Sequence, residues 1–164
     1  MPLYCSAGVV EIVTGDRETG KALSQCELDK IIFTGSVRGG MHIMEQASGN
    51  LVPVTLELGG KDPAIVLPDA SIEWTCRGIT WGAFTNAGQA CASVERVYIV
   101  KGKNTEKIIA KLSKLAGKIK LGAGTDPDAD MGPLIDQEQL NKVREQVEDA
   151  VSKGAKVLVG GHSR

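Results

Sequence analysis

Residues 30–48 read KIIFTGSVRGGMHIMEQAS, and they give the clearest indication of the fold class. Lys30–Thr34 is a short run rich in β-branched and aromatic residues, which is the pattern of a buried strand. A glycine turn follows, and Ser36 is then a typical N-cap for a helix over Ser36–Ser48 that stops at Gly49-Asn50. A strand, a tight turn and a helix in this order predict an α/β protein.

The alternation of strands and helices continues on both sides of this stretch. Further strands are predicted where short apolar runs recur, at Gly8–Val13, Val54–Leu58, Ala64–Leu67, Arg96–Val100 and Lys156–Val159. Further helices are predicted at Asp16–Cys26, Asp69–Ala83, Asn104–Lys120 and Asp136–Ser152, with Asp16, Asp69 and Asp136 as N-caps. Strands separated by helices imply right-handed βαβ units, and so a Rossmann-like parallel sheet with flanking helices.

Two of these helices have apolar faces that should reach the core. Their residues are Ile72, Cys76, Ile79 and Ala83 in one helix, and Ile108, Leu112, Leu115 and Ile119 in the next. The many lysines around the later helix are expected to form its solvated face.

Composition excludes several classes of function. The 164 residues are 42% hydrophobic and 24% charged, which is ordinary for a globular protein with a real core. The net charge of −1 gives no basic surface for nucleic acid or an anionic membrane. No apolar run is long enough to span a bilayer, and residues 1–15 do not resemble a signal peptide. The four cysteines and two histidines lack metal-ligand spacing, so we expect no metal site and a reducing, cytoplasmic setting.

The loop Phe84–Cys91, FTNAGQAC, contains the first candidate for chemistry. A free cysteine is most often an inert buried thiol. Asn86, Gly88 and Gln89, however, make this a polar loop, which is a poor place to bury an apolar side chain. Its backbone N–H groups would also be available to stabilise an oxyanion. We therefore interpret Cys91 as a nucleophile, and Cys5, Cys26 and Cys76 as packing or surface residues.

The second candidate is Glu57, within LELGGK at Leu56–Lys61. A carboxylate between apolar neighbours at a strand end would be partly desolvated, which would raise its pKa and make it a better base near neutral pH. The equally good alternative is a strand-end glutamate that faces solvent. Gly59-Gly60 would let a ligand approach the backbone closely.

The turn at Phe33–Gly40 is a candidate for phosphate binding. Backbone N–H groups and the helix dipole attract an anion where a strand leads through glycine into a helix. Arg38 lies in the first helical turn and could reach a phosphate or be solvated. Plain turn chemistry is the commoner reason for glycine at such a place, so this pattern is weak evidence alone.

Together these residues resemble the aldehyde dehydrogenase family, over nearly the whole chain. The glutamate motif resembles LELGGK at Leu56–Lys61, and the cysteine motif resembles F-x-N-x-G-Q-x-C at Phe84–Cys91, followed by Arg96. Phe33-Thr34-Gly35-Ser36 with Gly40 is similar to the cofactor turn of that family. Gly8-Val9-Val10 with Val13-Thr14-Gly15 is similar to the segment just before it.

The resemblance implies a mechanism and a cofactor. Cys91 would attack an aldehyde, hydride would pass to NAD or NADP, and Glu57 would activate the water that hydrolyses the thioester. It also implies cofactor contacts at Thr34, Gly35, Ser36, Gly40, Leu58 and Gly59. The presence of Glu57 favours release of a free carboxylic acid, since CoA-acylating relatives commonly lack this glutamate.

The resemblance further implies that the chain is a middle slice of a longer enzyme, a homo-oligomer when full-length. Residues 1–58 would be the C-terminal part of the NAD(P)-binding domain, and residues 59–164 the N-terminal part of the catalytic domain. We therefore expect weak or no turnover by this chain alone. Trp81 and Phe84 would either line the substrate tunnel or belong to the core. The alternative is a non-catalytic derivative that keeps the fold for structure or binding.

Overall fold

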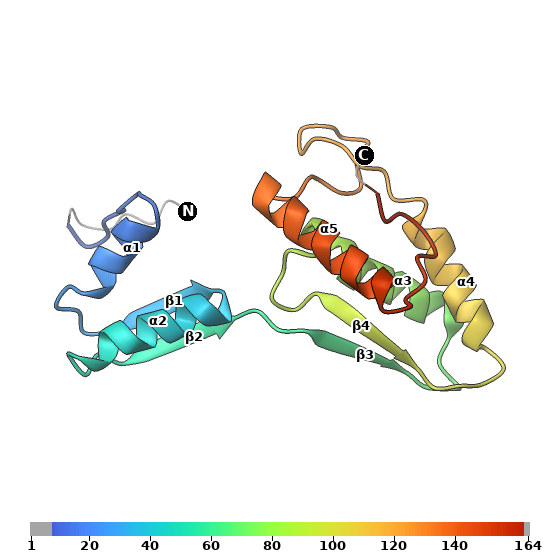
Figure 1. Cartoon of the computed structure of the whole chain (residues 1–164), viewed down its shortest axis with the longest axis horizontal. Helices are drawn as coiled ribbons and strands as arrows, with labels where there is room; N and C mark the ends of the chain where they lie inside the picture. Colours follow the sequence, from blue (N-terminus) through green and yellow to red (C-terminus); the bar gives the residue numbers. More distant parts are fainter. Residues whose placement is uncertain (1–7, 163–164) are drawn as a thin grey trace. The chain divides into compact units, whose positions relative to one another are not determined.

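The computed structural model describes residues 8–162 and divides the chain into two units, the first ending at Gly59 and the second beginning at Gly60 (Figure 1). Each unit contains parallel strands with helices beside them, as the alternating pattern of the sequence predicts. The fold is therefore α/β, although it holds two separate two-stranded sheets. No helix in the described part of the chain is both long and apolar enough to cross a membrane.

The first unit contains α1 (Arg17–Ser24), β1 (Ile31–Gly35), α2 (Val37–Ser48) and β2 (Val54–Leu58). The predicted caps are confirmed. The Asp16 carboxylate accepts hydrogen bonds from the backbone N–H groups of Glu18 and Thr19, and Ser36 Oγ accepts one from Gly39 N at 3.1 Å. Each cap satisfies backbone donors that a helix start leaves unpaired.

Close packing of α2 on the sheet of the first unit depends on Gly40. A Cβ atom at this position would lie 2.8 Å from Leu58 Cδ2 and 3.4 Å from Leu56 Cδ1. Since such contacts are too short, any side chain here would push the helix away from β2. Gly40 therefore sets the distance between α2 and the end of β2.

The second unit contains β3 (Asp62–Val66), α3 (Ile72–Phe84), the 3₁₀ turn η1 (Thr85–Gly88), β4 (Val94–Ile99), α4 (Thr105–Ala116) and α5 (Gln137–Ser152). Strands β3 and β4 run parallel with α3 between them in sequence, which is the predicted βαβ unit. At the start of α5, Asp136 Oδ1 accepts a hydrogen bond from Gln139 N at 2.8 Å, as the spacing predicts.

The core of the second unit lies between α3, α4 and the sheet of β3 and β4. Its buried residues are Val66, Cys76, Ile79 and Ile108, with Ile72, Leu112 and Leu115 among the half-buried residues around them. Six of the eight residues predicted for the two apolar faces are thereby confirmed, whereas Ala83 and Ile119 do not belong to this core and Ile119 lies beyond the end of α4. An ion pair between Lys111 and Glu73 joins the helices, and the hydrogen bond and charge of Lys111 lower the pKa of Glu73. Burial raises the pKa of the Cys76 thiol.

Two predicted strands are absent. Gly8–Val13 and Lys156–Val159 have no strand structure, and Ile12 is 87% exposed. A strand needs a neighbouring strand to satisfy its backbone groups, and neither segment pairs with one among residues 8–162. A composition typical of strands is therefore not enough to form one.

Three helix boundaries differ from prediction by two residues or more, and the first is the end of α1, at Ser24 rather than Cys26. Helix α3 starts at Ile72 with Ser71 in the N-cap position, because Ala70 N donates to Leu67 O and closes a turn that contains Asp69. Helix α4 ends at Ala116 rather than Lys120, with Gly117 at its C-cap.

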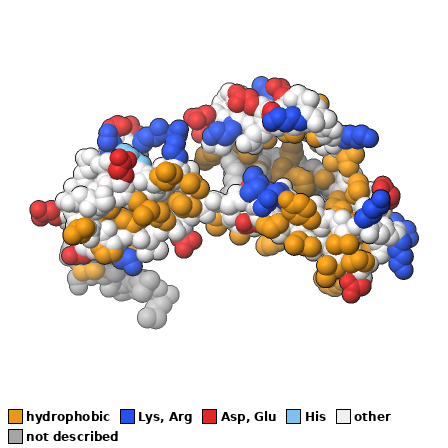
Figure 2. Space-filling model, turned by 60° about the horizontal axis from the view of Figure 1, so that its bottom comes forward, with side chains coloured by type: hydrophobic (Ala, Val, Ile, Leu, Met, Phe, Trp, Pro, Cys, Tyr) orange, Lys and Arg blue, Asp and Glu red, His pale blue; other side chains and the backbone are white. Residues whose placement is uncertain are grey.

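Large apolar side chains remain exposed on both units, and Figure 2 shows them grouped on the visible surface. Ile32 in β1 is 72% exposed, although this strand was expected to be buried, and Ile65 in β3 is 68% exposed. The reason is that each two-stranded sheet keeps an uncovered face. Exposed apolar area of this kind marks an interaction surface.

Candidate functional site

The cysteine loop begins with an unusual backbone. After α3 ends at Phe84, Asn86, Ala87 and Gly88 follow one another with φ angles of 53°, 58° and 76°. This left-handed region costs a residue with a side chain roughly 1–2 kcal/mol, and glycine tolerates it. Such a run persists only where other interactions hold it, and it leads directly to Cys91.

Side-chain amides hold this loop in place. Asn86 Nδ2 donates to Gln89 O at 3.0 Å, and Gln89 Nε2 donates in return to Asn86 O at 3.0 Å. Gln89 Oε1 also accepts a hydrogen bond from Ile135 N at 2.9 Å. On the far side of Cys91, the buried Ser93 donates from Oγ to Gly82 O at 3.3 Å. The loop is thus tied to the body of the second unit both before and after the thiol.

Cys91 itself is free and exposed. Cys91 is therefore not a buried thiol in this structure. Cys76 is the buried one, and Cys26 is exposed beyond the end of α1, so both are packing or surface residues as predicted. Cys5 lies outside the described residues. Trp81 is 75% exposed, which rules out a core position for it within this structure.

Glu57 lies near the end of β2 with its side chain exposed. The solvent-facing alternative holds in this structure, and the expected partial desolvation is absent. The reason is that Glu57 points away from the half-buried positions of Leu56 and Leu58, following the alternation of a strand.

The predicted cofactor residues of the first unit gather at one edge of its sheet. In the parallel register, Thr34 lies opposite Glu57 and Gly35 lies opposite Leu58, at the carboxyl ends of both strands. Ser36 caps α2 immediately after this edge, and Gly40 contacts Leu58 as described above. The carboxyl ends of parallel strands are where open α/β sheets bind ligands. Gly59 ends the first unit directly after Leu58.

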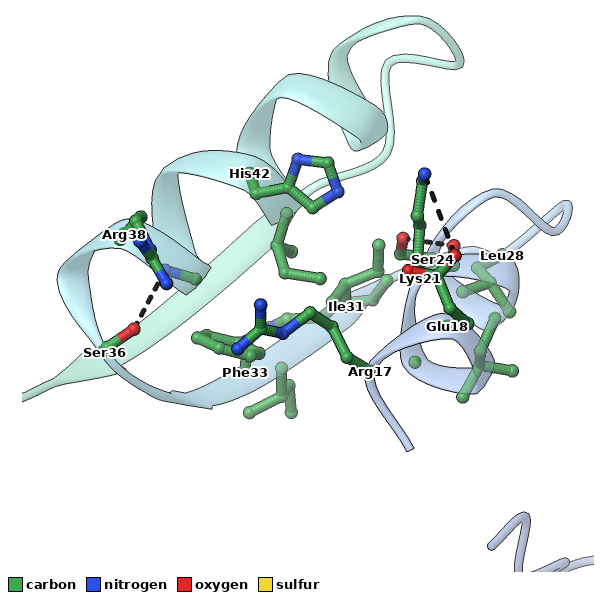
Figure 3. Close-up of a pocket in the computed structure, with 16 residues that line it drawn as sticks. Arg17, Glu18, Lys21, Ser24, Leu28, Ile31, Phe33, Ser36, Arg38 and His42 are labelled. Atoms are coloured by element: carbon green, nitrogen blue, oxygen red, sulfur yellow. Dashed lines mark hydrogen bonds and ion pairs between the residues drawn. The ribbon is translucent and has the colours of Figure 1, made fainter. Parts of the chain in front are cut away.

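A cavity of about 920 Å³ lies in the same unit, between α1, β1 and α2 (Figure 3). Arg17, Glu18 and Lys21 line it from α1, while Arg38 and His42 line it from α2. Its apolar wall includes Leu23, Leu28, Ile31, Phe33 and Ile43.

The charged side chains that line this cavity are mostly basic, with Arg17, Lys21, Lys30 and Arg38 against Glu18. Lys21 pairs with Glu18 at 4.0 Å, whereas Arg17, Lys30 and Arg38 have no ion-pair partner among residues 8–162. A Cβ at Gly35 would come within 2.6 Å of the Phe33 ring, so glycine keeps space beside it. Sequence reasoning missed the lining residues of α1. The signal available was a glycine-containing helix with basic residues Arg17 and Lys21, just before the turn predicted to bind the cofactor.

A second set of contacts fastens the glycine turn to the strand after Cys91. Arg96 donates from Nε to Lys61 O at 2.8 Å and also from Nη2 to the same oxygen. Lys61 Nζ pairs with Glu95 Oε1 at 3.3 Å. A Cβ placed on Gly60 would lie 3.9 Å from the Cys91 carbonyl oxygen, so Gly60 passes close to the cysteine backbone. Within residues 8–162, no group of three or more His, Cys, Asp or Glu side chains is placed to hold a metal ion.

Comparison with known proteins identifies the family. The model of the aldehyde dehydrogenase family matches residues 5–164. Glutarate-semialdehyde dehydrogenase of Pseudomonas putida is 41% identical over 157 residues, which cover 94% of this chain and 32% of the relative. The NADP(+) succinate-semialdehyde dehydrogenase of Escherichia coli is 39% identical over the same shares of the two chains.

Solved structures similar to this chain are also aldehyde dehydrogenases. The NAD+ complex of an aldehyde dehydrogenase from Bacillus cereus has a TM-score of 0.86 at 38% identity, covering 89% of this chain and 30% of that one. A betaine aldehyde dehydrogenase from Staphylococcus aureus, also with NAD+, has a TM-score of 0.84 at 36% identity, covering 89% and 29%. The chain spans about a third of the length of these relatives, and it belongs to the aldehyde dehydrogenase family.

Proposed function

We propose that this chain is the central segment of an NAD(P)-dependent aldehyde dehydrogenase, which oxidises an aldehyde to a carboxylic acid. Cys91 is the nucleophile and Glu57 the base. The observation that carries the proposal is the exposed Cys91 thiol at the end of a left-handed loop held by Asn86 and Gln89. A packing cysteine needs neither exposure nor a strained, hydrogen-bonded loop.

In the proposed reaction the Cys91 thiolate adds to the aldehyde carbon and forms a thiohemiacetal. NAD(P)+, held by Thr34, Gly35, Ser36 and Gly40, would supply the acceptor for the hydride that leaves this carbon. Cys91 then carries a thioester, and Glu57 removes a proton from the water that attacks it. The acid is released and the Cys91 thiolate is regenerated. The backbone N–H of Cys91 is one donor to the oxyanion in both addition steps.

The pairing of Glu57 with Cys91 is supported by the family to which the chain belongs, together with the resemblance of LELGGK and FTNAGQAC to the glutamate and cysteine motifs of that family.

The residues of the first unit fit a nicotinamide dinucleotide. The cavity offers apolar walls for an adenine ring, and Arg17, Lys30 and Arg38 offer positive charge for phosphates. The capped start of α2 adds backbone N–H donors. Thr34, Gly35, Ser36 and Gly40 would lie along the cofactor, with Leu58 and Gly59 toward the nicotinamide. These basic side chains and backbone N–H donors suit NAD and NADP alike.

The proposal assigns residues 1–58 to the cofactor-binding domain and residues 59–164 to the catalytic domain of the longer enzyme. A cytoplasmic location and a homo-oligomeric full-length protein belong to the same proposal. The chain alone is expected to give little or no NAD(P)H from a panel of aldehydes. Robust turnover by a chain of confirmed mass would refute that expectation.

The test of the nucleophile uses reversible addition, which needs no cofactor. Iodoacetamide alkylation of Cys91 should slow when aldehydes are present, because the thiohemiacetal masks the thiol, while the exposed Cys26 should label at an unchanged rate. Equal protection of both cysteines would mean that Cys91 has no special affinity for aldehydes.

A second candidate is a non-catalytic derivative that keeps the fold for structure or binding. The exposed apolar faces favour it, since they suit association with other protein segments. Under this alternative, Cys91 alkylates no faster than Cys26 and does not respond to Glu57→Gln.

A further inference from the structure

Gln89 uses both ends of its side-chain amide within the second unit. Its Nε2 donates to Asn86 O at 3.0 Å, and its Oε1 accepts a hydrogen bond from Ile135 N at 2.9 Å. Its backbone is held as well, because Gln89 N donates to Asn86 O at 3.1 Å and Asn86 Nδ2 donates to Gln89 O at 3.0 Å. Gln89 is half-buried, and partial exclusion of water strengthens such hydrogen bonds. The chain is thus held on two sides just before the thiol.

The partner of Gln89 Oε1 is itself anchored. Asp130 N and Met131 N both donate to Lys120 O, at 2.9 and 3.1 Å, which fixes residues 130 and 131 beside the chain that follows α4. Ile135 lies four residues further on and directly precedes Asp136, the N-cap of α5. A hydrogen bond to a segment that is held on both sides restricts the position of Gln89, whereas a bond to an unattached loop would move with it.

The backbone N–H groups that follow Gln89 are unpaired. Gln89 N has the acceptor given above, and Ser93 N donates to Ala90 O at 3.2 Å. Between them, the N–H groups of residues 90–92 have no acceptor among residues 8–162. Cys91 therefore combines an exposed thiol with an available backbone donor. When a thiolate adds to a carbonyl group, the developing oxyanion is stabilised by a donor of this kind only if the donor is already directed at it.

We propose that Gln89 is a positioning residue, which directs the Cys91 N–H toward the oxyanion by joining Asn86 O to Ile135 N. The inference rests on the proposed role of Cys91 as nucleophile. Gln89 need touch neither the substrate nor the cofactor, because it acts through the backbone of residues 89–91. Residues 86–88, which precede it, have left-handed φ angles and would relax toward commoner ones without the two hydrogen bonds of its side chain.

The test compares two reactions of the same thiol. In acylation by 4-nitrophenyl acetate, the Cys91 thiolate adds to the carbonyl carbon, an electron pair moves onto the carbonyl oxygen, and collapse of this oxyanion expels 4-nitrophenolate. Alkylation by iodoacetamide displaces iodide from a CH2 carbon and forms no oxyanion. A donor directed at the oxyanion therefore accelerates acylation and leaves alkylation unchanged.

Two variants separate the two ends of the amide. Gln89→Met keeps the length of the side chain and loses both hydrogen bonds, whereas Gln89→Glu keeps the acceptor for Ile135 N and loses the donor to Asn86 O. The control is Gln137→Met. Gln137 is an exposed glutamine of the same unit, and its Nε2 donates to Asn141 Oδ1 at 2.9 Å, within α5.

In Gln89→Met, acylation of Cys91 should fall roughly tenfold or more while its alkylation changes less than about twofold, because only the reaction that forms an oxyanion depends on the directed donor. Gln89→Glu should lie between this variant and the parent, and Gln137→Met should match the parent in both reactions. Cys76 is buried and should stay unlabelled throughout, while the exposed Cys26 gives the rates of a thiol outside the loop.

Equal losses of acylation and alkylation in Gln89→Met would overturn the positioning role, because the change would then lie in the thiol itself. Undiminished acylation would overturn it too, as would rapid labelling of Cys76, which reports a loosened core. If Cys91 of the parent takes the acetyl group no faster than Cys26, the assignment of the nucleophile fails and the positioning role fails with it.

Discussion

Replacing Ile108 by alanine removes an aliphatic side chain from the core of the second unit. Ile108 is 2% exposed and belongs to a buried cluster with Val66, Cys76 and Ile79. Truncation of a buried isoleucine to alanine costs about 2–5 kcal/mol, from lost burial and from the cavity left behind. Because so few side chains are fully buried, this is a large part of the roughly 5–15 kcal/mol that stabilises a typical domain.

The neighbouring thiol provides the assay. Cys76 Sγ lies 3.8 Å from the Ile108 carbonyl oxygen and has no exposed surface, so alkylation of Cys76 requires the core to open. Each 1.4 kcal/mol lost raises the open population about tenfold, so the Cys76 rate should rise roughly 25-fold or more. The matched control is Ile109→Ala, the same change at a half-buried position outside the cluster. An unchanged Cys76 rate, or an equal rise in the control, would refute this account of the core.

The remaining predictions concern the caps, the cysteine loop and an ion pair. Ser36→Ala should lower the free energy of unfolding by about 1 kcal/mol in urea titrations, because Gly39 N loses its acceptor, whereas Ser36→Gly should cost only a few tenths. Gly88→Ala should lower it by about 1–2 kcal/mol in thermal melts, because alanine is strained at a φ of 76°; equal stability would argue against the left-handed loop. The pKa of Glu73, lowered by Lys111, means that this pair stabilises the fold above the ordinary carboxyl pKa and that the stabilisation is lost as pH falls through the lowered value. Glu73→Gln should therefore flatten the acid limb of stability against pH, measured by urea midpoints between neutral pH and about pH 3.

The sequence pattern predicted a helix or strand correctly where that element depends only on its own residues and on a partner element within the chain. β1, α2 and β2 form as predicted, because the two strands pair with each other and Ser36 caps the helix between them. Gly8–Val13 has equally good strand composition and forms none, since composition does not reveal whether a partner strand exists.

In the candidate site, too, some residues could be predicted from local sequence and others could not. Cys91 and Glu57 were recognisable from their motifs, since the loop composition and the strand end are local properties. The hydrogen bond between Gln89 and Ile135 and those from Arg96 to Lys61 join residues far apart in sequence. Hydrogen bonds of this kind depend on tertiary packing, so no spacing rule predicts them. The apolar walls of the cavity were likewise hidden in ordinary helix and strand patterns.

The most direct measurement of the central claim is acylation by an activated ester such as 4-nitrophenyl acetate. A nucleophilic thiolate takes the acetyl group and releases 4-nitrophenolate, so no cofactor is needed. Peptide mapping should find the acetyl group on Cys91 rather than Cys26, and Glu57→Gln should lengthen the lifetime of the thioester. Acetyl spread equally over Cys91 and Cys26, with a lifetime that Glu57→Gln leaves unchanged, would contradict the assignment of Cys91 as nucleophile and Glu57 as base.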